Sequence, residues 1–357
     1  MTAALQSRVL YNLPVRALKL LFVLVPFFGL SASTQTSPIQ STGFDSNLRG
    51  VSVSKTHSGK YAMWVSGTKG IILRSLDDGK SWKQLKVEGV ADLDFRDIES
   101  FGETTAYVMS SGDGEKSRIY KTVDGGRSWT LQYTDKRAGF FLDALACDSR
   151  THCFALSDPV EGKFLILTTS DGEHWKELPH DKMPAALPTE GAFAASGTSI
   201  ALCGNKDIFF GTGGPAARVF HSADRRRSWT AAETPMASGN ASSGIFSVAC
   251  HGRSLVAVGG DYREPARTNK VAIYSTDSGA TWHLADQQPG GYRSAVAFLS
   301  GRDFVAVGTN GTDISHDAGV HWTHMDALNL NAVTFAAARG WAAGPKGTVA
   351  RFGERSH

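Results

Sequence analysis

The chain has 357 residues, of which 41% are hydrophobic and 20% are charged, and it contains 38 glycines. Its formal net charge is only +3, and no long basic run occurs, which excludes a dedicated nucleic-acid-binding protein. The length allows one large repeat domain or two ordinary ones, and the glycine content favours a turn-rich globular fold.

The N-terminal segment differs in composition from the rest of the chain. Basic residues precede an apolar run at residues 20–30, and the small residues SAS follow it. This order is typical of a secretory signal peptide, and the run is shorter than the ~20 residues that span a bilayer. We therefore expect residues 1–33 to be a signal peptide and residues 34–357 to form one domain. That domain would be exported to the periplasm or the extracellular space, without a stable membrane span after cleavage. An uncleaved anchor is the alternative.

A short motif, Ser/Thr-x-Asp-x-Gly-x-x-Trp, recurs along the chain. Its first two copies read SLDDGKSW from residue 75 and TVDGGRSW from residue 122, and later copies diverge. The motif aspartates recur every 40 to 53 residues, at Asp77, Asp124, Asp171, Asp224, Asp277 and Asp317. Aspartate and hydroxyl side chains accept hydrogen bonds from nearby backbone N–H groups, glycine permits a positive φ, and tryptophan buries a large ring. The motif therefore predicts a structural turn rather than a catalytic site.

Short strand-like runs accompany each motif. In the first repeat they cover residues 51–54, 61–67, 71–75 and 82–87. Four short strands per repeat are typical of one blade of a β-propeller. Six repeats are complete, and a seventh at the C-terminus lacks its outer strand. We predict an all-β, seven-bladed β-propeller closed by an N-terminal strand near residues 35–42, which would also cover a sheet edge.

These repeats resemble the Asp-box, or BNR, repeat, whose motif forms the turn between the third and fourth strands of a blade. The whole chain after residue 33 is similar to bacterial relatives of the photosystem II stability/assembly factor family. The similarity is carried by LRGVSVS at 48–54, WVSGTKG at 64–70, SDPVEGKF at 157–164 and GGYRSAV at 290–296. It implies a propeller with a binding or assembly role. Asp boxes also occur in sialidases and other secreted hydrolases, so the repeat alone fixes no activity.

Candidate binding residues fall on the loops at the ends of the strands away from the motif turns. Four of them follow one another at intervals of 47 residues, where the first strand of each blade begins. The full candidate set is Arg49, Arg96, Asp143, Asp158, Glu190, Asp261, Tyr262, Tyr292 and Arg293. We expect this set to ring the channel mouth and to bind an anionic group of a partner protein, small molecule or glycan. Arginine suits this role because its planar guanidinium can hold a carboxylate through two hydrogen bonds.

Two alternatives stay open at this stage. Arg96 could pair with Asp97 or Asp143, which would make the arginines a structural clamp between blades. The three arginines, the tyrosines and the carboxylates could instead form a sialidase-like glycoside hydrolase site, although the Arg-Ile-Pro signature of such enzymes is absent. We expect binding without catalysis, and therefore assign no catalytic residue.

No cofactor or metal ion is expected. The chain has no nucleotide fingerprint, and His316, His321 and His324 surround a motif turn without a clear further ligand. Cys147 and Cys153 flank a plausible hairpin turn, so a disulfide between them is permissible in an exported protein but not proven by the spacing.

Overall fold

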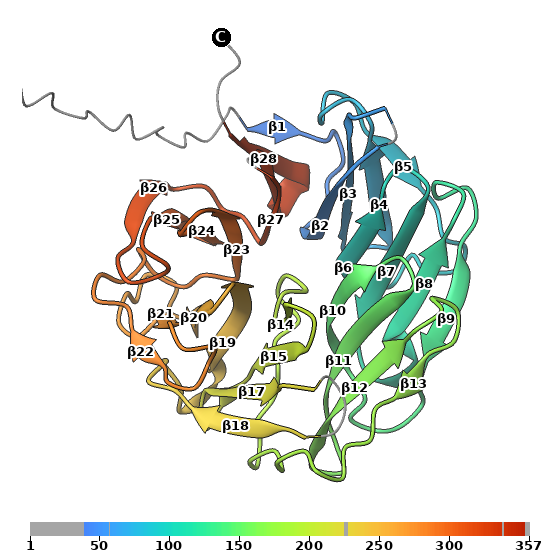
Figure 1. The fold of residues 1–357 in the computed structure, drawn as a ribbon. Helices are drawn as coiled ribbons and strands as arrows, with labels where there is room; N and C mark the ends of the chain where they lie inside the picture. The colour runs from blue at the N-terminus through green and yellow to red at the C-terminus, as the bar shows by residue number, and fades with distance from the viewer. Residues whose placement is uncertain (1–38, 57, 225–227, 338, 354–357) are drawn as a thin grey trace, which may run out of the picture. The chain divides into compact units, whose positions relative to one another are not determined.

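The strands form seven antiparallel sheets arranged as the blades of a ring (Figure 1). The structure is a computed structural model that describes residues 39–56, 58–224, 228–337 and 339–353. The predicted signal peptide lies outside the described residues. Within the described part of the chain, no helix is long and apolar enough to cross a membrane. The predicted seven-bladed β-propeller is confirmed.

The first four blades follow the chain from its inner to its outer strand. Blade 1 contains β2 (Leu48–Lys55), β3 (Tyr61–Gly67), β4 (Ile71–Ser75) and β5 (Lys83–Leu85). Blade 2 contains β6 (Asp94–Phe101), β7 (Thr105–Ser111), β8 (Arg118–Thr122) and β9 (Thr130–Thr134), with a 3-10 turn, η1 (Gly114–Lys116), between β7 and β8. Blade 3 contains β10 (Leu142–Ser149), β11 (His152–Val160), β12 (Lys163–Thr169) and β13 (Lys176–Glu177). Blade 4 contains β14 (Ile200–Cys203), β15 (Asp207–Gly211), β17 (Arg218–Ser222) and β18 (Thr230–Glu233).

The last three blades include two strands taken from elsewhere in the chain. Blade 5 contains β19 (Asn240–His251), β20 (Ser254–Asp261), β21 (Ala272–Ser275) and β22 (His283–Leu284), and β16 (Gly213–Gly214) pairs with β19. Blade 6 contains β23 (Ala295–Ser300), β24 (Asp303–Gly308), β25 (Gly311–Ser315) and β26 (Thr323–Asp326). Blade 7 contains β27 (Ala332–Ala336), β28 (Arg339–Gly344), β29 (Thr348–Phe352) and β1 (Gln40–Ser41), with η2 (Pro345–Gly347) before β29.

The ring closes between blades 7 and 1. β1 pairs antiparallel with β29, with Gln40 opposite Val349, and so supplies the outer strand that the seventh repeat lacks. This pairing covers an edge of β29 that would otherwise be open to another chain. At the inner end, Asn331 Nδ2 donates to the Leu48 carbonyl at 2.7 Å. Closure by an N-terminal strand is therefore confirmed.

The hydrophobic core consists of seven clusters, each between two neighbouring blades. Each motif tryptophan packs into the cluster that joins its blade to the preceding one. Trp129 meets Trp64 of blade 1 edge to face, with ring centroids 6.4 Å apart, and is half-buried. Trp322 is 1% exposed in the cluster between blades 5 and 6. The motif thus contributes to packing between blades as well as to the turn.

The motif turns use the aspartates to hold backbone and hydroxyl groups. In blade 1, Ser75 Oγ accepts from the Gly79 N–H at 2.9 Å, and Asp77 Oδ1 accepts from the Ser81 N–H at 2.9 Å. Gly79 has a φ of 83°, which other residues adopt only with strain. The Ser81 hydroxyl donates to Asp77 Oδ2 at 2.6 Å and is the main reason that the pKa of Asp77 falls to about 2. These carboxylates are occupied by the turn.

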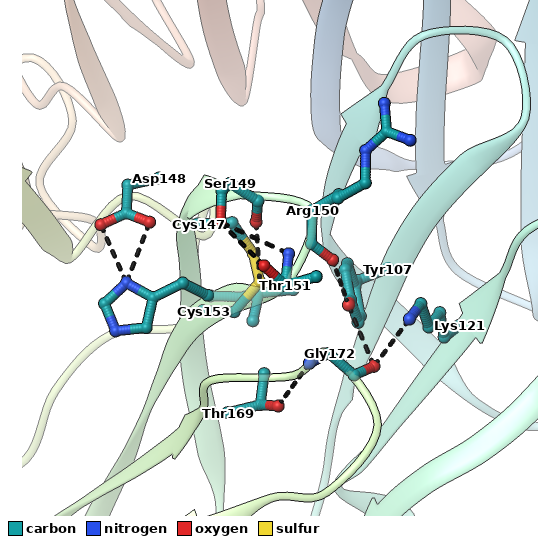
Figure 2. Close-up of a disulfide and its surroundings, with 12 residues drawn as sticks. Tyr107, Lys121, Cys147, Asp148, Ser149, Arg150, Thr151, Cys153, Thr169 and Gly172 are labelled. Atoms are coloured by element: carbon teal, nitrogen blue, oxygen red, sulfur yellow. Dashed lines mark hydrogen bonds and ion pairs between the residues drawn. A yellow bond between two sulfur atoms is a disulfide. The ribbon is translucent and has the colours of Figure 1, made fainter.

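Two disulfides join the described cysteines, none of which is free. Cys147 and Cys153 are bonded across the β10–β11 hairpin (Figure 2). Cys203 on β14 and Cys250 on β19 form a second bond, which links blades 4 and 5 and which we did not predict. Figure 2 also shows Tyr107 of blade 2 donating to the Arg150 carbonyl of blade 3 at 2.7 Å.

Candidate functional site

A pocket of about 570 Å³ opens at the channel mouth. It lies where the inner strands begin. In the blades that carry the motif, the motif turn follows the third strand, which runs parallel to the first, so the motif turns lie at the opposite end of the blades. Six of the nine candidate residues line it: Arg49, Arg96, Asp143, Asp158, Tyr262 and Tyr292.

A β-bulge positions four pocket side chains. The pairing of β2 with β3 passes from Leu48 to Gly50, so that Arg49 has no partner of its own. The same one-residue shift leaves Arg96 unpaired on β6, Asp143 on β10 and Phe246 on β19. An extra residue in one strand bends the strand and re-aims its side chain. The bulge therefore turns equivalent residues of blades 1, 2, 3 and 5 toward one pocket.

Arg49 brings a positive charge that no carboxylate balances directly. None of the described residues forms an ion pair with it, and an amide atom of Asn47 lies 3.2 Å from its Nε and 3.3 Å from its Nη2. Burial, together with the nearby Arg96, lowers the pKa of Arg49. A guanidinium that is partly desolvated and unpaired is costly in the free protein and favours an incoming anion.

Arg96 is only partly engaged. Its Nε donates to Asp94 Oδ2 at 2.8 Å and its Nη1 to the Ala194 carbonyl at 2.8 Å. The side chain stays 26% exposed. The alternative ion pairs of Arg96 with Asp97 or Asp143 do not form among the described residues; Arg96 pairs with Asp94, and Asp97 is held by the N–H groups of Ile98 and Leu145, each at 2.7 Å.

Asp143 and Asp158 form an acidic pair on blade 3. Asp143 is 1% exposed, and neither of its carboxyl oxygens has a hydrogen-bond partner among the described residues. Burial, together with the charge of Asp158, raises the pKa of Asp143 well above its usual range. Asp158 Oδ1 accepts from the Ala192 N–H at 2.8 Å, and burial raises its pKa to about 6.

Aromatic side chains from blades 4 to 6 form the opposite wall. Phe193 stacks on Phe246 with ring centroids 3.8 Å apart, and Tyr292 meets Phe246 edge to face at 4.8 Å. Tyr262 stands at the rim with 45% exposure. The sequence analysis does not identify the two phenylalanines as candidate residues. The pocket thus has a charged half from blades 1 to 3 and an aromatic half from blades 4 to 6.

The remaining candidates, Arg293, Glu190 and Asp261, do not line this pocket. Arg293 is fully buried, and its Nε donates to Asp313 Oδ2 at 2.5 Å and its Nη1 to Asn310 Oδ1 at 2.6 Å. Its Nε and Nη1 donors are used inside the protein, and its Nη2 forms an ion pair with Asp313. The expectation that Arg293 joins Arg49 and Arg96 at the channel mouth is therefore wrong, and the three-arginine arrangement of the sialidase-like alternative is not formed, since only two guanidinium groups line the pocket.

Glu190 and Asp261 also have structural partners. Glu190 accepts from Thr212 Oγ1 at 2.6 Å and from Arg218 Nε at 2.8 Å, which ties the loop before blade 4 to β17. Asp261 accepts from Asn240 Nδ2 at 3.0 Å and from the Arg263 N–H at 2.9 Å. Both carboxylates hold loops in place.

The three C-terminal histidines each face a different aspartate. His321 Nδ1 lies 2.7 Å from Asp317, and His316 and His324 contact Asp303 and Asp313. Within the described ranges, no group of three or more His, Cys, Asp or Glu side chains is placed to hold a metal ion.

Residues 44–300 match the family described as the DUF6242 beta propeller domain. Among curated proteins, the chain is 29% identical over 72 residues to the photosystem II assembly lipoprotein Ycf48 of Synechococcus sp. (strain CC9902). That alignment covers 20% of this chain and 20% of the relative, so the chain matches a fifth of the relative's length.

Several solved structures share the fold. YCF48 bound to D1 peptide aligns with a TM-score of 0.64 and 13% identity, over 89% of this chain and 96% of that one. YCF48 from Cyanidioschyzon merolae gives 0.62 and 16%, over 89% and 99% of the two chains. A virginiamycin B lyase from Staphylococcus aureus gives 0.62 and 13%, also over 89% and 99%. At these identities the similarity concerns the fold alone, and the resemblance to photosystem II assembly factors is confirmed at the level of the propeller.

Proposed function

The chain belongs to the DUF6242 β-propeller family, and we propose that it is an exported binding or assembly module that recognises an anionic group of a partner protein at the channel mouth. A protein partner is supported by the similar fold of YCF48, which is described bound to a D1 peptide. Export is supported by the signal-like segment at residues 1–33 and by two disulfides, which form in oxidising compartments.

The observation that carries this proposal is the guanidinium of Arg49 in the pocket, which has no carboxylate partner among the described residues and only the amide of Asn47 beside it. Arg293, the buried arginine of blade 6, shows the contrasting arrangement, with Asp313 and Asn310 taking its donors. A pocket of about 570 Å³ with an aromatic wall is large enough to enclose the end of a peptide or a compact organic anion. Arg49 would hold the anionic group, and the aromatic wall would cover its apolar part.

We propose binding without turnover. A sialidase-like site would need three guanidinium groups and a reactive tyrosine beside an acidic partner. Here Tyr292 is 4% exposed and packs edge to face on Phe246, and burial raises the pKa of its hydroxyl. A tyrosine that keeps its proton and is sealed against an aromatic ring is poorly suited to attack a substrate.

A peptide library tests the proposal. The immobilised protein is incubated with random peptides that have either a free C-terminal carboxylate or an amidated end, and mass spectrometry identifies those retained. Arg49→Gln removes the pocket charge, whereas Arg253→Gln removes an exposed charge at the β19–β20 turn, at the far end of blade 5. We expect anionic peptides to be retained by the wild type and by Arg253→Gln but lost by Arg49→Gln. Equal retention by all three proteins would overturn the proposal.

A further inference from the structure

We infer that the same pocket takes a protonated amine between the carboxyl groups of Asp143 and Asp158, so that its ligand carries an ammonium group as well as the anionic group that faces Arg49. This inference deepens the proposed function and rests on it for the identity of the pocket. The ligand class is a primary amine and a carboxylate joined by an aliphatic spacer.

Asp143 is the first reason for this assignment. The bulge on β10 places it in the pocket wall, yet neither of its carboxyl oxygens has a hydrogen-bond partner among the described residues. The nearby Asp158 N–H is already used, because it donates to the Phe141 carbonyl at 2.9 Å. Burying an acidic group without a partner is unfavourable, so a structural role does not account for Asp143. A cationic donor arriving from the pocket would supply the missing hydrogen bonds.

The surrounding groups favour an amine over a metal ion. An ammonium group has three donors and can be shared between the Asp143 and Asp158 carboxyl groups. A calcium or magnesium ion requires about six oxygen ligands, and in the described part of the chain these two carboxylates have no third acidic neighbour that completes a site. Arg96 forms its ion pair with Asp94 at 2.8 Å, and its charge only partly offsets the burial that raises the pKa of Asp143.

The positions of the two oppositely charged residues in the pocket determine the general structure of the ligand. Arg49 lies on blade 1 and Asp143 on blade 3, and both line one pocket. Phe193 and Phe246 cover the opposite side with their stacked rings. A ligand that satisfies both charges therefore has its ends separated by an apolar part that can lie on the aromatic wall.

Calorimetric titration with three matched probes tests the inference. Caproate carries only the anion, hexylamine only the amine, and ε-aminocaproate carries both on the same aliphatic chain. The proteins are the wild type, Asp143→Asn, Arg49→Gln and, as a matched control, Glu233→Gln, which removes an exposed carboxylate on the outer strand of blade 4. We expect the wild type and Glu233→Gln to bind ε-aminocaproate about tenfold more tightly than caproate, the gain of one charge-assisted interaction. Asp143→Asn should lose this advantage and bind caproate and ε-aminocaproate with about equal affinity.

Other outcomes separate this inference from the proposed function. Equal affinity of the wild type for caproate and ε-aminocaproate would overturn the inference, while the loss of caproate binding in Arg49→Gln would still support the anion site. Absence of caproate binding together with hexylamine binding that depends on Asp143 would contradict the anion site and support the amine site. Binding of calcium or magnesium that depends on Asp143, without any amine binding, would overturn the choice of ligand.

Two further measurements complete the design. If Asp143 serves ligand binding, the melting temperature of free Asp143→Asn equals or exceeds that of the wild type, whereas a structural role would lower it. A peptide that ends in lysine, compared with the same peptide ending in norleucine, shows whether the amine is presented by a protein chain or only by a small molecule.

Discussion

Arg49 and Asp143 occupy the same bulge position on β2 and β10, two blades apart, and line one pocket with opposite charges. A repeated backbone irregularity thus carries different side chains to a common site. The motif turns at one end of the blades stabilise the fold, whereas the side chains at the other end can differ from blade to blade without loss of the fold. The predictions that follow separate residues that maintain the ring from those that serve the pocket.

The motif tryptophans should differ in their contribution to stability. Trp322 is 1% exposed, and its Nε1 donates to the Gly319 carbonyl at 3.1 Å. Trp322→Ala should lower the free energy of unfolding by about 3–5 kcal/mol because it leaves a large cavity between blades 5 and 6. Trp129 is only half-buried, so Trp129→Ala should cost clearly less. Denaturant unfolding of both variants measures the difference, and equal losses would contradict this account of the packing.

The disulfide between blades 4 and 5 should matter more than the hairpin disulfide. Cys203 and Cys250 are 47 residues apart in sequence, whereas Cys147 and Cys153 are 6 apart. The chain-entropy relation gives about 4 kcal/mol for the longer loop and about 2 kcal/mol for the shorter one. Replacing each pair by serine and comparing thermal melts tests the order. A larger loss for the hairpin pair would show that strain or residual structure dominates.

Arg293 should be a stability residue rather than a binding residue. Its side chain is fully buried and paired with Asp313, which is 1% exposed. Arg293→Met leaves Asp313 buried without its counter-ion and should lower the free energy of unfolding by about 3–5 kcal/mol. Affinity for anionic peptides, measured below the melting temperature of the variant, should stay within about twofold of the wild type. A large loss of affinity in a protein that remains folded would place Arg293 in the binding site after all.

Stability should decline as the pH rises from about 4 to about 7. Burial raises the pKa of Asp97 to about 7 and that of Asp158 to about 6 in the folded state. Below about pH 4, Asp97 and Asp158 are protonated in both the folded and the unfolded protein. Above about pH 4 the unfolded chain releases these protons while the folded protein still holds them, so unfolding becomes more favourable. The contributions of Asp97 and Asp158 to this decline end once the pH exceeds their folded-state pKa values. Asp77, whose pKa is lowered to about 2, acts in the opposite direction, and its stabilising effect is lost only as the pH falls below about 4.

Asp158→Asn tests this pH dependence. Asparagine can still accept the Ala192 N–H through its amide oxygen but releases no proton. The melting temperature of the variant should fall less steeply between about pH 4 and pH 6 than that of the wild type. Parallel profiles for the two proteins would show that Asp158 has the same pKa in both states.

Much of the fold could be predicted because it repeats. The motif from Ser75 to Trp82 combines local turn chemistry with a large buried ring, and six copies at similar spacing define the blades without knowledge of distant contacts. The missing outer strand of the seventh repeat likewise indicated closure by the N-terminal segment. The disulfide from Cys203 to Cys250 depends on two inner strands lying side by side, which spacing alone does not show.

The pocket could be predicted only in part. The 47-residue interval that aligns Arg49, Arg96 and Asp143 is preserved because the first three blades have the same length and the same bulge. Blade 4 begins its inner strand later, at Ile200, so the same interval led to Glu190, which holds a loop. Whether an arginine is free or paired depends on neighbours such as Asp313, which sequence spacing does not bring together.

The central claim is that Arg49 is open to an anion while Arg293 is closed. Nitrogen-15 NMR of the arginine side chains measures this directly, through the Nε–Hε signals of both residues before and after addition of caproate. The Arg49 signal should exchange rapidly with water in the free protein and shift as caproate is added. The Arg293 signal should not shift, either in the wild type or in Asp143→Asn. An Arg49 signal that is protected from exchange and does not respond to caproate would contradict the claim.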